Sequence, residues 1–242
     1  MKIFAVGMNY IQHNKELDGA LYKTEAPVIF TKADSALLTR GKPFFVPDHL
    51  GRIDYEAELV VRICRLGKSI PVRFAHRYYD AVTVGIDFTA RDLQRQARAK
   101  GMPWTICKGF DGSAAIGEWV TLEDGELKGE AEGAFAEQSG RAAATLQHSE
   151  QRRKRMGGGR AGRKVDGLHF RLDKNGETVQ QGHAADMLYG VDELISYISQ
   201  FFTLKTGDLL YTGTPVGVGP VSIGDHLEGW LEDRKVLDMN CR

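Results

Sequence analysis

The stretch that most constrains this chain is residues 53–61, IDYEAELVV, where two acids run directly into branched apolar residues. The apolar run continues through residues 60–63 and indicates a strand with both faces buried. Because side chains two apart on a strand point to one face, Glu56 and Glu58 are expected side by side at its mouth. Two such carboxylates need a cation or a shared proton, and hard divalent ions prefer oxygen ligands. The alternative is an exposed edge strand with two solvated glutamates.

The composition indicates a soluble protein of one large or two small domains. The chain has 242 residues, and its 32 basic and 32 acidic side chains leave no net charge that would favour nucleic acid. The three scattered cysteines, Cys64, Cys107 and Cys241, suit a reducing cytoplasm rather than a disulfide framework. No apolar run approaches the length of a membrane span or a signal peptide. The 28 glycines favour many turns and hence a β-rich fold.

Periodicity and turn signals predict a series of short elements. Strands are expected at residues 2–7, 27–31 and 82–88 and from residue 105, and a hairpin is expected around Asn175-Gly176. Helices are expected at residues 72–82, 90–100 and 191–202, and the C-terminal residues 224–242 indicate an edge hairpin.

His13 and Glu16 lie three residues apart in a segment between Gly7 and Gly19. On one helical turn they would face the same way, as a general base and its orienting partner do. The flanking glycines would allow the segment to move. The alternative is a polar, solvated turn.

Four further polar residues lie within or after predicted strands. Asp87 interrupts a buried strand and needs either a partner or a role as a helix N-cap. Lys108 precedes a glycine turn, where it would either extend to water or present a fixed positive charge to an oxyanion. Thr212 and Thr214 lie in a glycine loop that would let backbone N–H groups approach an anion, unless the loop is a plain turn.

Residues 128–165 differ from the rest of the chain. They are poor in branched apolar residues and rich in Gly, Ala, Glu and Arg, and no period of 2 or 3.6 runs through them. They are therefore interpreted as a low-complexity basic insert. Their basic cluster could bind polyanions weakly, but they lack the Gly-Lys-Ser/Thr of a phosphate-binding loop.

Six motifs occur in one order: HNKE, DYEAELVV, GIDFTARDLQ, PWTICKGFDG, NGETVQQG and TGTPVGVGP. Together they resemble the fumarylacetoacetate hydrolase family, especially its small branch of acylpyruvate hydrolases and oxaloacetate decarboxylases. The resemblance covers residues 1–127 and 166–242. It implies one catalytic domain over residues 1–242, with an α+β, β-rich roll, and a homodimer.

The resemblance also implies a role for individual residues. The metal ligands would be Glu56, Glu58 and Asp87, holding Mg²⁺, with Mn²⁺ or Ca²⁺ as alternatives. The residues that the resemblance assigns to substrate and catalysis are Gln94 and Lys108 for substrate oxygens, Thr214 for the substrate carboxylate, and His13 with Glu16 for catalysis.

The function expected on this basis is metal-dependent hydrolysis of a carbon–carbon bond in an acylpyruvate or a fumarylpyruvate-like 2,4-dioxo acid. Products would be pyruvate and a carboxylic acid. The alternatives on the same site are an oxaloacetate decarboxylase and a 2-hydroxyhepta-2,4-diene-1,7-dioate isomerase or tautomerase. A non-enzymatic alternative is a protein that binds 2-oxo acids or polyanions.

Overall fold

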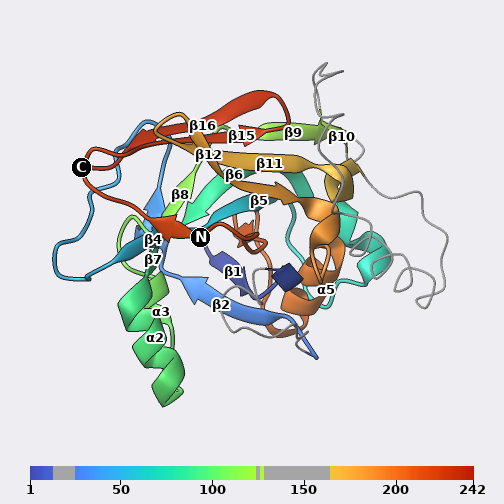
Figure 1. Ribbon diagram of the computed structural model, residues 1–242. Helices are drawn as coiled ribbons and strands as arrows, with labels where there is room; N and C mark the ends of the chain where they lie inside the picture. Colours follow the sequence, from blue (N-terminus) through green and yellow to red (C-terminus); the bar gives the residue numbers. More distant parts are fainter. Residues whose placement is uncertain (13–24, 124–125, 128–163) are drawn as a thin grey trace.

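The computed structural model describes residues 1–12, 25–123, 126–127 and 164–242 (Figure 1). His13, Glu16 and residues 128–163 of the predicted insert lie outside this part of the chain. Within the described residues, strands dominate and the helices are short, so the predicted β-rich, α+β fold class is confirmed. None of the described helices is long and apolar enough to cross a membrane.

The elements of the described chain follow in sequence order. The strands of the first half are β1 (Ile3–Gly7), β2 (Val28–Lys32), β3 (Leu37–Leu38), β4 (Ile53–Tyr55), β5 (Ala57–Ile63), β6 (Tyr79–Asp87), β7 (Thr89–Ala90), β8 (Ala114–Ile116), β9 (Val120–Glu123) and β10 (Glu126–Leu127). The strands of the second half are β11 (His169–Lys174), β12 (Glu177–His183), β13 (Leu209–Tyr211), β14 (Gly219–Pro220), β15 (His226–Leu231) and β16 (Arg234–Asn240). The α-helices are α2 (Arg91–Lys100), α3 (Thr105–Lys108) and α5 (Val191–Phe201), and the 3-10 helices are η1 (Asp34–Ala36), η2 (Val72–Arg77), η3 (Lys164–Gly167) and η4 (Ala184–Asp186).

The described strands form three sheets. The largest has nine strands, of which seven run in the order β10-β9-β6-β5-β13-β1-β2, while β8 pairs with both β6 and β3. A four-stranded sheet has the order β12-β11-β15-β16, and a three-stranded sheet has the order β14-β4-β7. In Figure 1 the four-stranded sheet lies over β5 and β6, and contacts of β11 with β5 and of β15 and β16 with β6 join the two layers.

The core lies between these two layers and continues under α5. Strands β5 and β6 are almost entirely buried, as expected for the branched residues at their centres. Helix α5 places an apolar face, including Leu194, Ile195 and Ile198, against the core and also contacts η2. This packing makes β5 and β6 a rigid support for the polar residues at their ends.

Two predicted elements are wrong. The predicted helix at residues 72–82 is a short 3-10 helix, η2, and strand β6 already begins at Tyr79. The predicted strand from Thr105 is helix α3, which ends at Lys108. In both stretches, short apolar runs fit a helix and a strand equally well, and tertiary packing decides between them.

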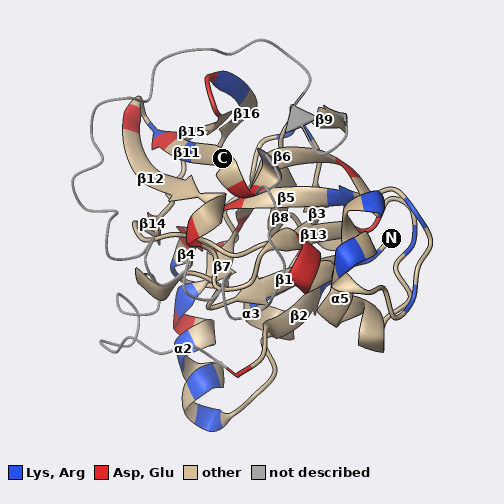
Figure 2. Ribbon diagram, turned by 90° about the vertical axis from the view of Figure 1, so that its right-hand side faces the viewer, with Lys and Arg blue, Asp and Glu red and all other residues tan. Residues whose placement is uncertain are grey.

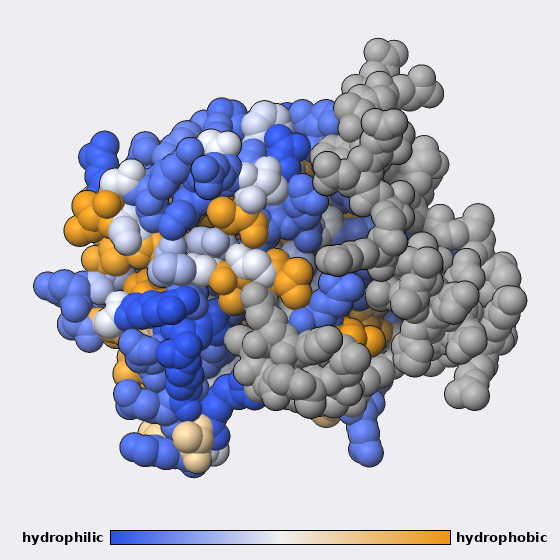
Figure 3. Space-filling view, viewed as in Figure 1, coloured by the Kyte–Doolittle hydropathy of each residue, from blue (hydrophilic) through white to orange (hydrophobic). Residues whose placement is uncertain are grey.

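Helix α2 projects from the sheets and is strongly basic, with Lys and Arg along it in Figure 2. The same region is deep blue in the hydropathy view, whereas apolar groups on that face form small patches (Figure 3). The helix ends as predicted at Gly101, whose φ of +63° is the left-handed conformation typical of a glycine C-cap. In its first turn, in contrast, Arg91 and Gln94 are buried.

Candidate metal and substrate site

Two paired segments of chain pass together from one sheet to another. Strand β4 pairs with β7 in the three-stranded sheet. The next strand after β4 is β5, and the strand before β7 is β6; these two pair with each other in the large sheet. Glu56 occupies the junction of β4 and β5, and its carbonyl oxygen accepts a hydrogen bond of 2.8 Å from the backbone N–H of Asp87, the last residue of β6. Glu58 lies two residues beyond Glu56, on β5. This junction brings together the three acids that the sequence analysis selected.

The three carboxylates form a buried cluster that fits a divalent ion. Glu56, Glu58 and Asp87 are each no more than 5% exposed, and one oxygen from each lies within 4.8 Å of the others. A six-coordinate hard ion holds opposite oxygens roughly 4–5 Å apart, so these atoms can share one ion. Burial raises the pKa of Glu58 well above its usual value, and the charges of Asp87 and Glu56 raise it further. A cation among the three would relieve that repulsion.

Lys108 provides a positive charge at this cluster. Its Nζ donates to Glu56 Oε2 at 2.7 Å, to Asp87 Oδ2 at 2.8 Å and to Thr89 Oγ1 at 2.7 Å. Burial lowers its pKa, but the neighbouring charges of Asp87 and Glu56 outweigh burial, so the pKa is raised. Lys108 is therefore a fixed ammonium group, and not a surface lysine, although it ends a helix and not the predicted strand.

Lys32 is a second buried lysine, and the sequence analysis gave it no role. Its Nζ lies 2.6 Å from Asp87 Oδ1 and donates to Ser113 Oγ at 3.1 Å, to the Ser113 carbonyl at 3.0 Å and to the Lys108 carbonyl. The two lysines thus contact different oxygens of the Asp87 carboxylate. Burial lowers the pKa of Lys32, and the charge of Asp87 opposes that shift. A lysine at the end of a strand is typical of a solvated position, so its sequence carried little signal of burial.

Arg91 links the first turn of α2 to the acidic cluster, and the sequence analysis also missed it. Its guanidinium donates to Glu56 Oε1 at 2.7 Å and to Asp54 Oδ2 at 2.7 Å. A third N–H group donates to Gln94 Oε1 at 2.5 Å. Gln94, one of the predicted substrate residues, is therefore fixed through its carbonyl oxygen. The available signal was the spacing of Arg91 and Gln94, which are three apart and share one helical face.

The loop after β13 closes another side of the site. The Gly213 backbone N–H donates to Glu58 Oε2 at 2.6 Å. Gly213 has a φ of +101°, and a Cβ there would lie 2.7 Å from Cβ of Asn9, so only glycine fits this close approach. Thr212 donates its hydroxyl to the Leu59 carbonyl at 2.8 Å and therefore stabilises the strand.

Thr214 is held by a glutamine that the sequence analysis did not select. The Thr214 hydroxyl donates to the Ala57 carbonyl at 2.8 Å and accepts from Gln180 Nε2 at 2.9 Å. Gln180 is on β12, and its carbonyl oxygen accepts from the Ala57 backbone N–H at 2.8 Å. The buried side-chain amide of Gln180 thus connects strand β12 to strand β5 and to the loop after β13.

A pocket of about 430 Å³, including its mouth, opens over these groups. Its polar residues include the three acids together with Lys108, Gln94, Thr214 and Arg98. Its apolar residues include Val6, Phe30 and Trp104. All the predicted metal ligands and substrate residues that the structure describes therefore face one space.

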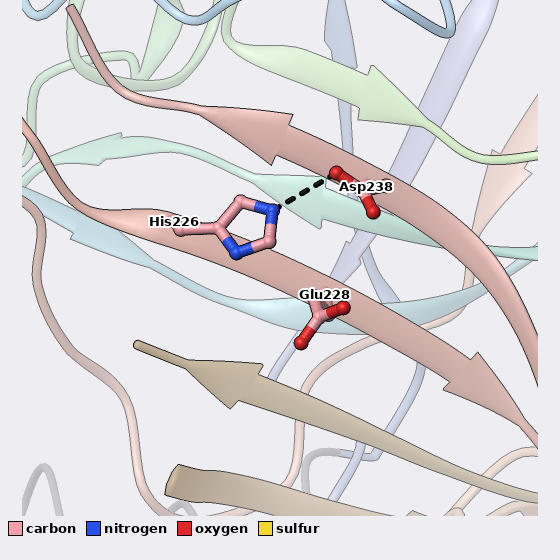
Figure 4. A group of neighbouring side chains, drawn as sticks. All are labelled: His226, Glu228 and Asp238. Carbon is pink, nitrogen blue, oxygen red and sulfur yellow. Dashed lines mark hydrogen bonds and ion pairs between the residues drawn. The ribbon is translucent and has the colours of Figure 1, made fainter. Parts of the chain in front are cut away.

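A second group of potential ligands lies on the exposed hairpin of β15 and β16 (Figure 4). Ligand atoms of His226, Glu228 and Asp238 lie within 4.8 Å of one another, and His226 contacts Asp238 at 2.9 Å. The ammonium of Lys235 lies 2.8 Å from both carboxylates. This group is a surface ion network with its own cation, unlike the buried cluster.

Comparison with known proteins identifies the family of the chain. Residues 2–241 match the model of the C-terminal domain of fumarylacetoacetate hydrolase. The chain is 36% identical to mitochondrial oxaloacetate tautomerase FAHD1 of Arabidopsis thaliana, covering 93% of this chain and 84% of that protein. It is 32% identical to the oxaloacetate tautomerase YcgM of Escherichia coli, covering 93% and 86%.

A solved structure shows the same fold. Fumarylpyruvate hydrolase from Pseudomonas aeruginosa, in complex with Mn²⁺ and pyruvate, matches with a TM-score of 0.76 at 30% identity, covering all of this chain and 89% of that one. The family match spans nearly the whole chain, and these relatives are similar over most of their own length. The chain therefore belongs to the fumarylacetoacetate hydrolase family.

Proposed function

We propose that this chain is a divalent-metal-dependent hydrolase that cleaves a carbon–carbon bond in an acylpyruvate to give pyruvate and a carboxylic acid. The observation that carries the proposal is the convergence of three buried carboxylates with Lys108, Gln94 and Thr214 around one pocket. The similarity to a fumarylpyruvate hydrolase that was solved with Mn²⁺ and pyruvate supports it.

Glu56, Glu58 and Asp87 would hold the ion, Mg²⁺ in the first place, because hard divalent ions prefer carboxylate oxygens. When bound there, it would supply Lewis-acid stabilisation for negative charge on the substrate's 2-oxo oxygen. The carboxylates themselves are oriented before any ion arrives, since Arg91 and Gly213 each hold an oxygen of Glu56 or Glu58.

The remaining described groups would bind and orient the substrate. Lys108 would stabilise the negative charge that develops as the bond breaks, because its ammonium is fixed and buried. The Gln94 carbonyl oxygen is taken by Arg91, which leaves its amide N–H groups to donate to a substrate oxygen. The Thr214 side chain, in a loop of small residues, would contact the substrate carboxylate.

His13 and Glu16 complete the proposal on sequence resemblance alone, because they lie outside the described residues. His13 would take a proton from the water that attacks the distal carbonyl, and Glu16 would orient its imidazole. The last residue of β1, Gly7, and the residue after it, Met8, contribute to the pocket wall on the way to this pair.

Oxaloacetate tautomerisation is a second candidate, and the names of two relatives at 32–36% identity favour it. This reaction moves a proton and requires no attacking water. Decarboxylation of oxaloacetate and isomerisation of a 2-oxo-diene acid would use the same described residues. A protein that only binds 2-oxo acids would have little use for His13.

The decisive experiment compares substrates with the purified protein before and after removal of metal with EDTA. Acylpyruvates, oxaloacetate and 2-hydroxy-diene acids are incubated with Mg²⁺, and loss of enol absorbance is recorded beside release of pyruvate. Hydrolysis gives both signals on acylpyruvates. Loss of enol absorbance on oxaloacetate, with no pyruvate from oxaloacetate or from any acylpyruvate, would instead establish a tautomerase. Gel filtration with light scattering would test the expected homodimer in the same preparation.

A further inference from the structure

A second pocket, of about 380 Å³ including the open space at its mouth, lies beside the candidate site and has no part in the chemistry proposed above. Its walls come from the chain after Asn9, the end of β12, η4 and the loop after Thr214. The residues that matter for its chemistry are Ile11, Pro215 and Val216, which are apolar, and Tyr10, His183 and Asp186.

Two segments of chain run from the first pocket to the second. In the first segment, Met8 lines the first pocket and Tyr10 lines the second. In the other segment, Thr214 lines the first pocket and Pro215 lines the second. Two residues of extended chain span at most about 7 Å, so the walls of the two pockets are close in two places. These two segments form the partition between the pockets, and the buried Tyr10 belongs to it.

The backbone of this partition is firmly held. Asn9 Nδ2 donates to the Thr212 carbonyl at 2.7 Å and to the Tyr189 carbonyl at 3.1 Å, and its side-chain oxygen accepts from the Tyr189 backbone N–H at 2.9 Å. The second pocket is therefore held at a constant position relative to the first. A substrate seated at the acidic cluster would extend past Thr214 toward it.

The charge of the described residues that line the second pocket disfavours one class of substrate. Asp186 contributes an acid, and no lysine or arginine lines the pocket among the described residues. Burial lowers the pKa of His183, and the neighbouring His169, whose ring stacks on it at 4.1 Å, lowers it further. The imidazole therefore stays neutral near pH 7 and offers a hydrogen bond but no positive charge. Among the described lining residues, a terminal carboxylate would find no cation to offset its loss of water.

We propose that the second pocket is the subsite for the acyl end of the substrate and that it selects an uncharged acyl chain over one that ends in a carboxylate. The inference rests on the proposed hydrolase function and specifies its substrate class. Ile11, Pro215 and Val216 would contact the aliphatic part of the chain. His183 would meet a polar group near its end.

The test compares acetylpyruvate, hexanoylpyruvate and fumarylpyruvate with the Mg²⁺-loaded enzyme, following pyruvate release. The wild type is expected to prefer hexanoylpyruvate to fumarylpyruvate in kcat/KM. Val216→Trp fills the pocket from a partly exposed position and should lower kcat/KM for hexanoylpyruvate by about tenfold, the scale of a lost apolar contact, while acetylpyruvate changes little. Ile223→Trp, at an exposed residue that does not line the pocket, is the matched control.

A second variant tests the charge. His183→Lys places a cation beside Asp186 and should shift the preference toward fumarylpyruvate, with acetylpyruvate again unaffected. A wild-type preference for fumarylpyruvate, or ratios that neither variant changes, would overturn the subsite while leaving the hydrolase proposal intact. Absence of pyruvate release from all three substrates would overturn the proposed function itself, and the subsite with it.

Discussion

The ammonium group of Lys32 donates a hydrogen bond to the backbone carbonyl of Lys108, so that one buried lysine fixes the peptide of the other. Lys32 also contacts the Asp87 oxygen that Lys108 does not. Lys32 therefore fixes the backbone from which the Lys108 side chain extends. It also fixes the orientation of the Asp87 carboxylate. Lys32 acts on the candidate site through two other residues and contacts no pocket itself among the described residues.

The first prediction concerns Lys32→Met, which keeps the length of the side chain and removes its charge. Removal of one partner from a buried ion pair typically costs about 3–5 kcal/mol in the free energy of unfolding. We expect a lower midpoint of urea unfolding and weaker Mg²⁺ binding by calorimetry, because Asp87 loses a partner. Lys235→Met, on the exposed surface, is the control and should change neither. Wild-type Mg²⁺ affinity in a folded Lys32→Met variant would show that Asp87 is oriented without Lys32.

The second prediction concerns the acidic cluster. Glu58→Gln and Asp87→Asn preserve shape but remove charge, so each should abolish calorimetric Mg²⁺ binding and metal-dependent turnover while leaving a folded protein. Glu228→Gln, in the surface group of Figure 4, is the matched control. It tests whether the loss of any carboxylate would reduce Mg²⁺ binding. Full turnover of both cluster variants after EDTA treatment would contradict a metal site at this position.

The third prediction separates the two candidate reactions. His13→Ala should lower acylpyruvate hydrolysis by about 10²–10⁴-fold if the imidazole is the general base. Mg²⁺ binding should be unchanged, because no imidazole belongs to the buried cluster. Tautomerisation or decarboxylation of oxaloacetate should retain a larger share of its rate, because neither needs water to be deprotonated. Unchanged hydrolysis in His13→Ala would place the base elsewhere.

The fourth prediction concerns two stacked imidazoles with opposite pKa shifts. The Glu232 carboxylate, 3.7 Å from Nδ1 of His169, raises the pKa of His169, whereas burial lowers that of His183. The stability that His169 gains from Glu232 is therefore complete below its unfolded pKa of about 6.5 and is lost as pH rises through the folded value. NMR titration of the ring protons should give a higher pKa for His169 than for His183. Glu232→Gln should lower the pKa of His169 and so narrow the difference, and an unchanged pKa of His169 would refute this origin.

The fifth prediction concerns the sequence insert. Strand β10, which ends at Leu127, contacts η3, which begins at Lys164, so a short Gly/Ser linker can replace residues 128–163. Val165 is retained because it is buried in the core. We expect turnover within a few-fold of wild type and little change in unfolding, because loop closure changes by only about 0.6 kcal/mol per doubling of length. Failure of the shortened chain to fold would show that the segment belongs to the domain.

The sequence predicted the buried strands well because their branched residues have a strong local preference. Strands β1 and β5, the Asn175-Gly176 hairpin and helix α5 all appear where periodicity and turn residues placed them. The prediction of a strand at Thr105 was wrong, because the short apolar run at the start of α3 is compatible with both a helix and a strand. The packing of this segment against β2 and β7 determines that it forms a helix.

The candidate site was predictable only in part. Glu56 and Glu58 were conspicuous as acids beside a buried strand, and Asp87 was conspicuous within one. Lys32 and Arg91 were not, because charged residues at a strand end or on a basic helix usually face water. Their burial depends on partners 76 and 35 residues away in sequence, at Lys108 and Glu56, which only the folded chain brings near.

The break between β4 and β5 has a mechanical consequence. Glu56 and Asp87 stand where a two-stranded ribbon leaves the small sheet and enters the large one. An ion shared by them would act as a cross-link between two separately hydrogen-bonded sheets, so its binding would be coupled to the angle between those sheets. Anything that twists the ribbon at this junction would alter the spacing of the ligands, and with it the affinity for the ion. The stiffness of the sheet-to-sheet crossing would thus be one determinant of which ion the proposed site selects.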